Sequence, residues 1–260
     1  MDRTVNTSGA TISYTAEGSA DAPPLLLINS IAATREMWAR QLEAFASRFR
    51  VIRYDARGHG RSSVPAGDYT VEQLGRDALA ILDQEEVAAA HICGISLGGL
   101  TAMWLGVNAS ARVRGLVLSN TAARIGTVAS WSERMTLVRE RGMSAVAELT
   151  IPRWFSPEFR ERDPETVHAF RAMIQSMPPE GYLGCCAALR DADLREAIGT
   201  ITCPVLAIAG SSDPATAPEG LHVIHQTIPH STLVTLDTAH LSNVECAAEF
   251  TAAVMAFLKP

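Results

Sequence analysis

The strongest chemical signal in this sequence is a cluster of glycines around one serine. The string Gly94-Ile95-Ser96-Leu97-Gly98-Gly99 follows a short apolar run and precedes a stretch with helical spacing. A Gly-x-Ser-x-Gly turn between a strand and a helix exposes its serine oxygen, because the small neighbours allow a sharp turn. The positive end of the helix then lies beneath the serine. The pattern predicts that Ser96 is a nucleophile and that the backbone N–H of Leu97 faces the reacting oxygen.

A serine nucleophile needs a base, and the base needs a carboxylate that orients it. In proteins with this type of turn, the order along the chain is serine, acid, histidine. Asp213 follows one apolar run and His240 follows the next, so both are expected at the carboxyl ends of strands. The alternative acid position holds Asn120, which cannot serve, and Asp237 is too near His240 in sequence to be the first choice. We therefore predict a triad of Ser96, Asp213 and His240.

A second backbone donor is expected in the loop that follows the apolar run 25–28. This loop reads Asn29-Ser30-Ile31-Ala32, and we assign the N–H of Ile31 to the developing oxyanion. Loss of one such donor commonly costs about 2.7–4 kcal/mol of transition-state stabilisation. His59 lies in a glycine-rich string at 55–62, which we interpret as a turn behind the site.

Alternating apolar runs and helical patterns imply a mostly parallel sheet with helical crossovers. The expected strands are 12–17, 25–28, 51–54, 91–93, 113–119, 204–210 and 233–236, and the expected helices are 71–84, 100–107 and 244–258. The segment 122–199 breaks this alternation, because it has helical periodicity, several prolines and no clear strand. We interpret it as a helical cap, with 1–121 and 200–260 as the core domain. A run of ordinary crossover helices is the alternative.

The composition limits the partners of this chain. It has 260 residues, of which 47% are hydrophobic and 19% charged, and a formal net charge of −6. This composition excludes a disordered chain, and a mildly acidic protein has no general attraction to nucleic-acid phosphates. The apolar runs fall far short of the ~20 residues of a membrane span. We expect no nucleic-acid or membrane partner, and the sequence leaves the oligomeric state open.

Cysteine usage indicates a reducing compartment. The five cysteines are an odd number without a Cys-x-x-Cys motif, so we expect free thiols in a cytoplasmic protein. The first residues also lack the apolar core of a signal peptide. His222 and His225 could share a helix face, but no third ligand is evident, so we predict no metal site.

Longer strings resemble the α/β-hydrolase superfamily, and they run from near the start of the chain to near its end. The strings at 55–62 and 93–100 occur in many of its members. Two strings around the predicted cap, Asn120-Thr121-Ala122-Ala123-Arg124-Ile125-Gly126 and Pro152-Arg153-Trp154-Phe155, resemble the bacterial 3-oxoadipate enol-lactonases in particular. Many superfamily members have His-Gly where this chain has Asn29-Ser30, so the loop before Ile31 departs from the common pattern.

The resemblance implies an α/β-hydrolase fold, which is a mostly parallel central sheet flanked by helices, with a helical cap inserted after the sixth strand. It further implies that Ser96 attacks the carbonyl carbon of a small anionic lactone in the β-ketoadipate pathway of aromatic-compound degradation. No metal or organic cofactor is needed for this chemistry.

The carboxylate of such a substrate needs a cation. Lys259 is the only lysine in the chain, so arginine must bind the carboxylate. Trp131 and Arg134 are three residues apart and share a helix face, so our first choice is Arg134 with Trp131 as an apolar wall. Further candidates from the enol-lactonase-like strings are Arg124, Arg153 and Trp154.

Three other functions remain open. A broad carboxylesterase or a C–C bond hydrolase would keep the same triad. A small-molecule receptor on a hydrolase fold would bind its ligand without useful turnover. A broad carboxylesterase would differ from an enol-lactonase in having no site that binds a free carboxylate.

Overall fold

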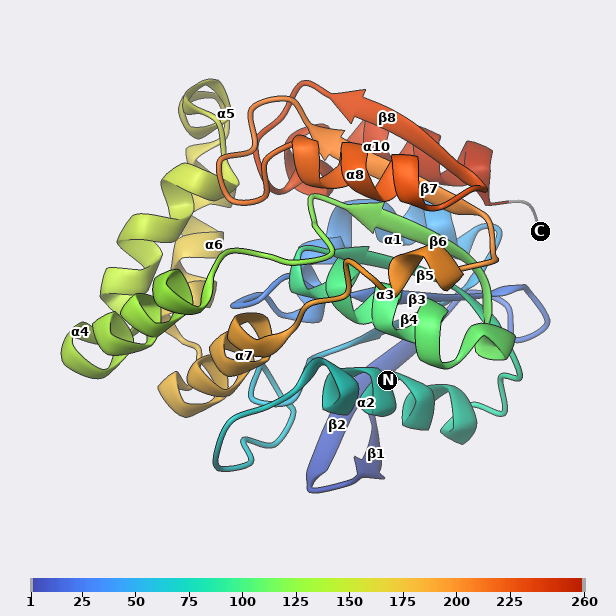
Figure 1. Ribbon diagram of the computed structural model, residues 1–260, viewed down its shortest axis with the longest axis horizontal. Coiled ribbons are helices and arrows are strands. Elements are labelled where there is room, and N and C mark those ends of the chain that lie inside the picture. Colours follow the sequence, from blue (N-terminus) through green and yellow to red (C-terminus); the bar gives the residue numbers. More distant parts are fainter. Residues whose placement is uncertain (1, 259–260) are drawn as a thin grey trace.

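One β-sheet organises the part of the chain that the computed structural model describes, residues 2–258. Within these residues its eight strands are β1 (Arg3–Thr7), β2 (Ala10–Glu17), β3 (Pro24–Ile28), β4 (Arg50–Tyr54), β5 (Ala90–Ile95), β6 (Val113–Ser119), β7 (Val205–Gly210) and β8 (Ser231–Leu236). They lie in the order β1-β2-β4-β3-β5-β6-β7-β8 (Figure 1). The pairs β1–β2 and β2–β4 are antiparallel, and the remaining pairs are parallel.

Helices flank the sheet (Figure 1). The helices of the core are α1 (Ala39–Ala46), α2 (Val71–Gln84), α3 (Leu97–Asn108), α8 (Glu219–Thr227), α9 (Ser242–Glu245) and α10 (Ala247–Phe257), with short 3-10 helices η1 (Arg35–Trp38), η2 (Ser110–Arg112) and η3 (Ile198–Thr200). Helix α1 packs against α10, and α2 packs against α3. A mostly parallel sheet between helices confirms the predicted fold class.

Burial explains which strands the sequence predicts well. The side chains of Leu25, Leu26 and Leu27 are fully buried, because β3 lies inside the sheet and is covered on both faces. The edge strand β1 reads RTVNT and is mostly exposed, so it lacks the apolar run that identifies the inner strands. The prediction of one continuous helix over 244–258 is wrong. Cys246 has φ −119° and ψ 56°, which is not helical backbone, and it separates α9 from α10.

Four helices lie between β6 and β7, beyond one end of the sheet (Figure 1). They are α4 (Val128–Trp154), α5 (Pro157–Arg162), α6 (Pro164–Gln175) and α7 (Pro179–Asp191). Helix α4 packs against both α6 and α7, and it is interrupted at Gly142, whose φ is 68°. The expected helical cap after the sixth strand is therefore present. We propose residues 122–199 as its boundaries.

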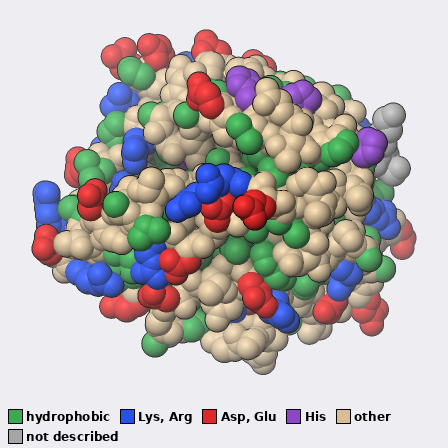
Figure 2. Space-filling model, in the orientation of Figure 1, with side chains coloured by type: hydrophobic (Ala, Val, Ile, Leu, Met, Phe, Trp, Pro, Cys, Tyr) green, Lys and Arg blue, Asp and Glu red, His purple; other side chains and the backbone are tan. Residues whose placement is uncertain are grey.

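The surface carries no large region of one charge on the face that Figure 2 shows. Acidic and basic side chains are interspersed there with apolar and neutral groups. Across residues 2–258, no helix has both the length and the apolar character that a bilayer crossing requires.

Candidate active site

Ser96 occupies a strained turn between β5 and α3. Its backbone has φ 58° and ψ −117°, a region that residues other than glycine rarely adopt. A Cβ atom at Gly94 would lie 2.2 Å from the carbonyl oxygen of Gly98, and one at Gly98 would lie 2.3 Å from that of Ile28. Both glycines are therefore required by close backbone approach. The turn has the geometry of a nucleophile elbow.

The end of β6 holds this turn in place. The backbone N–H of Ser96 donates to the carbonyl oxygen of Ser119 at 3.1 Å. The hydroxyl of Thr121 donates to the carbonyl oxygen of Ser96 at 2.8 Å. The strain at Ser96 is thus balanced by hydrogen bonds on both sides of the residue.

Asp213 and His240 form a buried pair in the loops after β7 and β8. The Nδ1 atom of His240 lies 2.8 Å from Oδ2 of Asp213, and the two residues are 2% and 4% exposed. The other carboxylate oxygen, Oδ1, accepts the backbone N–H groups of Ala215 at 2.8 Å and Thr216 at 3.0 Å. With Nδ1 donating to Asp213, the Nε2 atom of His240 is the nitrogen that remains to accept a proton.

The Asp213 carboxylate is stabilised in its charged form. Burial raises the pKa of this group, but the charge and hydrogen bond of His240, together with hydrogen bonds from Thr216 and Asn120, lower the pKa to about 2. Asp213 is therefore ionised at neutral pH and can stabilise a positive charge on His240. Asp237, the other acid near His240, is exposed and accepts a hydrogen bond from Ser211 at 2.9 Å instead.

Asn120 supports this pair in a way that the sequence analysis missed. Its amide nitrogen donates to Oδ2 of Asp213 at 3.0 Å and to the carbonyl oxygen of Ala239 at 3.1 Å. Its amide oxygen accepts the hydroxyl groups of Ser119 and Ser242, each at 2.7 Å. The signal in the sequence is a polar amide placed directly after β6, where we considered only an acid.

Two backbone N–H groups are available beside Ser96. Among residues 2–258, the amides of Leu97 and Ile31 donate to no protein acceptor. Leu97 is the first residue of α3, where N–H groups lack partners within the helix. Ile31 lines the same cavity as Ser96. This arrangement supports the proposed oxyanion donors, although Ser30 replaces the usual glycine.

A cavity of about 80 Å³ lies between the core and the cap. The core contributes Ser96, His240 and Ile31 to its wall. The cap contributes Trp131, Arg134, Thr150, Arg153, Trp154 and Tyr182. No hydrogen bond joins the Ser96 hydroxyl to His240 within the described chain, and such catalytic bonds commonly tighten when substrate binds.

Two arginines give this cavity a positive wall. Arg134 donates to the hydroxyl of Thr150 at 3.3 Å, and Arg153 is exposed at the rim. Neither forms an ion pair within residues 2–258, and no acidic side chain of that range lines the cavity. The structure does not bring Arg124 there, because Arg124 pairs with Asp193 at 3.0 Å outside the cavity wall.

The aromatic residues of the cap are held in fixed orientations. The indole N–H of Trp131 donates to the carbonyl oxygen of Ile125 at 2.7 Å. Trp154 packs edge-on against Phe170, with 6.0 Å between ring centroids. Burial raises the pKa of Tyr182 well above its usual range, so its hydroxyl stays neutral. Tyr182 and Thr150 were not among the predicted residues.

The cap is joined to the loop of His240 by one backbone hydrogen bond and by a shared carboxylate. The N–H of Leu241, the residue after His240, donates to the carbonyl oxygen of Trp154 at 3.1 Å. The carboxylate of Glu245 accepts the N–H groups of Ser156 at 3.3 Å and Ala239 at 3.2 Å. The end of α4 and the histidine loop are therefore tied together at two points.

The cysteines lie apart from this chemistry. All five are free thiols. Burial raises the pKa of Cys93, and also of Cys185, far above the usual thiol value. Buried neutral thiols of this kind are poor nucleophiles.

The chain is similar over nearly its whole length to proteins named as hydrolases. The sequence model of the alpha/beta hydrolase fold family matches residues 23–246. The chain is 41% identical over 256 residues to 3-oxoadipate enol-lactonase 2 of Acinetobacter baylyi, covering 98% of this chain and 96% of that protein. It is 37% identical over 254 residues to 3-oxoadipate enol-lactonase 1 of the same organism, covering 98% and 95%. The crystal structure of an enol-lactonase from Burkholderia xenovorans LB400 matches with a TM-score of 0.96 and 38% identity, covering 98% of this chain and 99% of that one. The chain therefore belongs to the α/β-hydrolase fold family, and it is similar to the 3-oxoadipate enol-lactonases of that family.

Proposed function

We propose that this protein is a carboxylic ester hydrolase that opens the lactone ring of 3-oxoadipate enol-lactone to give 3-oxoadipate. The observation that carries the proposal is one cavity that joins Ser96 and His240 to two unpaired arginines, Arg134 and Arg153. An ester-cleaving centre and a site for a free carboxylate then face the same cavity. The similarity to two proteins named 3-oxoadipate enol-lactonase supports this substrate.

The proposed reaction uses Ser96, His240 and Asp213 as nucleophile, base and orienting acid. Ser96 Oγ attacks the lactone carbonyl carbon while Nε2 of His240 accepts its proton. The N–H groups of Leu97 and Ile31 stabilise the oxyanion of the tetrahedral intermediate. The ring C–O bond then breaks, and the leaving enolate takes the proton that Nε2 of His240 had accepted from Ser96, which leaves His240 neutral and yields the ketone. Water activated by His240 finally releases the acid from Ser96.

The cap residues bind the part of the substrate that does not react. Arg134 forms hydrogen bonds to the free carboxylate through its planar guanidinium group. Trp131 and Trp154 pack against the ring and its apolar arm. These contacts lie away from the reacting carbonyl carbon, and they orient that carbon toward Ser96.

We also propose that the enzyme acts in the cytoplasm, in the β-ketoadipate pathway of aromatic-compound degradation. Five unpaired thiols fit a reducing compartment. The pathway role rests on the resemblance to the enol-lactonases.

The deciding experiment measures turnover of the enol-lactone by loss of its ultraviolet absorbance. Hydrolysis should be rapid for the wild-type protein and lower by roughly 10⁶ for Ser96→Ala. A neutral ester of similar size is the comparison substrate, and it should be hydrolysed less efficiently. Equal efficiency on both substrates would favour a broad carboxylesterase. A burst of product without steady turnover would favour a receptor, and inactivity on both esters would contradict the proposal.

A further inference from the structure

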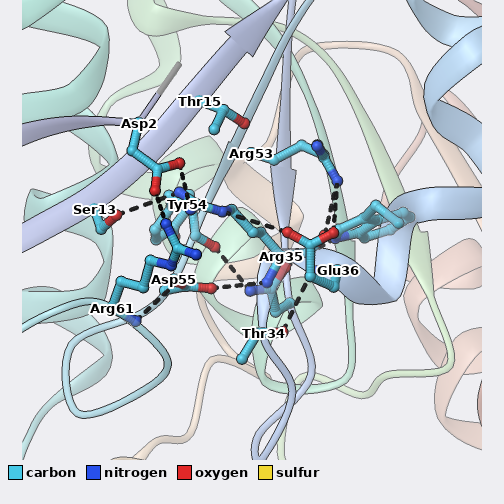
Figure 3. A network of polar contacts seen from close by, with 12 residues as sticks. Asp2, Ser13, Thr15, Thr34, Arg35, Glu36, Arg53, Tyr54, Asp55 and Arg61 are labelled. Atoms are coloured by element: carbon cyan, nitrogen blue, oxygen red, sulfur yellow. Dashed lines mark hydrogen bonds and ion pairs between the residues drawn. The ribbon is translucent and has the colours of Figure 1, made fainter. Parts of the chain in front are cut away.

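The loop that carries Ile31 is held from one side by the end of β4 and the turn that follows it. We call residues 29–35 the oxyanion loop and residues 55–62 the support turn. The amide nitrogen of Asn29 donates to the carbonyl oxygen of Tyr54 at 2.8 Å. The backbone N–H of Arg35 donates to Oδ1 of Asp55 at 2.8 Å, as Figure 3 shows. Both ends of the oxyanion loop are thus fixed to one neighbouring segment.

The middle of the oxyanion loop is held by a histidine side chain. The backbone N–H of Ala32 lies 3.0 Å from Nε2 of His59. The other ring nitrogen, Nδ1, lies 3.2 Å from the carbonyl oxygen of Arg57. His59 is 1% exposed and does not line the cavity. It therefore cannot touch the substrate and can act only through the loop.

These two contacts determine the protonation state of the ring. An N–H group can only donate, so Nε2 of His59 must carry no proton where it meets Ala32. A carbonyl oxygen can only accept, so Nδ1 must carry the proton where it meets Arg57. The ring is therefore neutral. Burial lowers the pKa of His59, while the Arg57 carbonyl and the Asp55 charge raise it less, which agrees with that state.

The loop needs such a contact because its backbone is strained. Ala32 has φ 62°, in the left-handed region that residues other than glycine rarely occupy. Conformations of this kind persist only where surrounding contacts hold them. The N–H that His59 accepts belongs to this strained residue. Releasing it would let the adjoining peptide planes rotate, including the plane that carries the Ile31 N–H.

We propose that His59 is a positioning residue, whose neutral Nδ1-protonated ring holds the Ala32 amide and keeps the Ile31 N–H directed at the oxyanion. This inference rests on the proposed serine-hydrolase mechanism. It assigns a function to the histidine of the support turn. A purely structural role would instead affect folding without a specific effect on the transition state.

Two substitutions separate the two hydrogen bonds of the ring. The amide of His59→Gln extends to the position of Nε2, so its oxygen can accept the Ala32 N–H. The amide of His59→Asn is one methylene shorter, so it can donate to the Arg57 carbonyl but cannot reach Ala32. Both variants lose the ring and introduce a neutral amide. They are therefore matched controls for any general loss of packing.

The variants are compared in hydrolysis of p-nitrophenyl acetate and in binding of a trifluoromethyl ketone. Ser96 adds to that ketone, and the resulting oxygen anion occupies the oxyanion hole. Full loss of one donor costs about 10²–10³ in kcat. We therefore expect His59→Asn to lower kcat by about tenfold to a hundredfold, with KM little changed and ketone affinity reduced by a similar factor. His59→Gln should recover most of this loss.

Several results would overturn the inference. His59→Asn with unchanged kcat, or equal losses in both variants that follow their melting temperatures, would show that the ring is only structural. If His59→Asn does not fold, ¹⁵N spectra of the wild-type histidines provide a second test, and a proton on Nε2 of His59 would be decisive against it. A wild-type protein inactive on the enol-lactone would contradict the proposed substrate alone, because these assays use a different ester.

Discussion

Truncation of Arg134 tests how the proposed substrate carboxylate is bound. Arg134 lies in the cavity wall, is partly buried, and forms no ion pair within residues 2–258. The protein has a net charge of −6, so its overall field does not attract an anion. A local cation must therefore provide the affinity for the free carboxylate. Arg134→Ala removes that cation and leaves Ser96 and His240 unchanged.

The expected magnitude follows from the burial of the two cavity arginines. Truncating one partner of a desolvated pair costs about 2–5 kcal/mol, and an exposed pair contributes under about 1 kcal/mol. Arg134 lies between these limits, so we expect a loss of about 2 kcal/mol, or roughly 30-fold in kcat/KM. Arg153 is exposed, so Arg153→Ala should cost under about fivefold.

The assay compares kcat/KM for the enol-lactone with that for a small neutral ester. Arg134→Ala should impair the first substrate and leave the second nearly unchanged, and Arg134→Lys should recover only part of the loss. Arg124→Ala is the matched control, because Arg124 pairs with Asp193 outside the cavity wall. Equal losses on charged and neutral substrates would refute the reasoning and make Arg134 a structural residue.

Three further predictions concern the residues around Ser96 and His240. The folded-state pKa of Asp213, about 2, lies below the ordinary ~3.9. Its contribution of about 2–3 kcal/mol to folding is therefore present above pH ~4 and lost as pH falls toward 2. Urea unfolding at several pH values should show that wild type and Asp213→Asn differ less in free energy of unfolding as the pH falls. A difference that stays constant with pH would contradict this prediction. Asn120→Asp places a second negative charge where the Asn120 amide now donates to Asp213 at 3.0 Å. We therefore expect kcat to fall and the acid limb of the pH–rate profile to move to higher pH. An unchanged profile would argue against the hydrogen bond between Asn120 and Asp213. Gly98→Ala places a Cβ 2.3 Å from a backbone oxygen and should reduce soluble, active protein, whereas Gly199→Ala, with 3.7 Å to its nearest neighbour, should be tolerated.

The core and the three proposed triad positions are predictable because their signals are local. Each follows an apolar strand, and the carboxyl ends of parallel strands meet at one edge of the sheet. The order of Ser96, Asp213 and His240 along the chain then restricts the choice of acid and base. Asn120 was missed as a supporting residue because its partners lie 93 and 119 residues away in the chain.

The cavity wall is harder to predict because it depends on how the cap helices pack. Spacing alone placed Trp131 and Arg134 on one face, and both line the cavity. Arg124 has the same charge and lies in a family-like string, but its partner Asp193 is 69 residues distant. Tyr182 reaches the cavity from α7, and its place depends on the packing of α7 against α4. Such long-range packing leaves no periodic pattern in the sequence.

The hydrogen bonds between the end of α4 and the histidine loop limit which sequence changes the cap can accept. The bond from the Leu241 N–H to the Trp154 carbonyl joins two backbone groups, so any residue except proline at 241 can form it. Cap side chains can therefore be exchanged to suit other substrates while this backbone tether still sets the distance between cap and histidine. Replacing a whole cap would instead have to reproduce that carbonyl position, so specificity in this scaffold is easier to alter by side-chain substitution than by segment exchange.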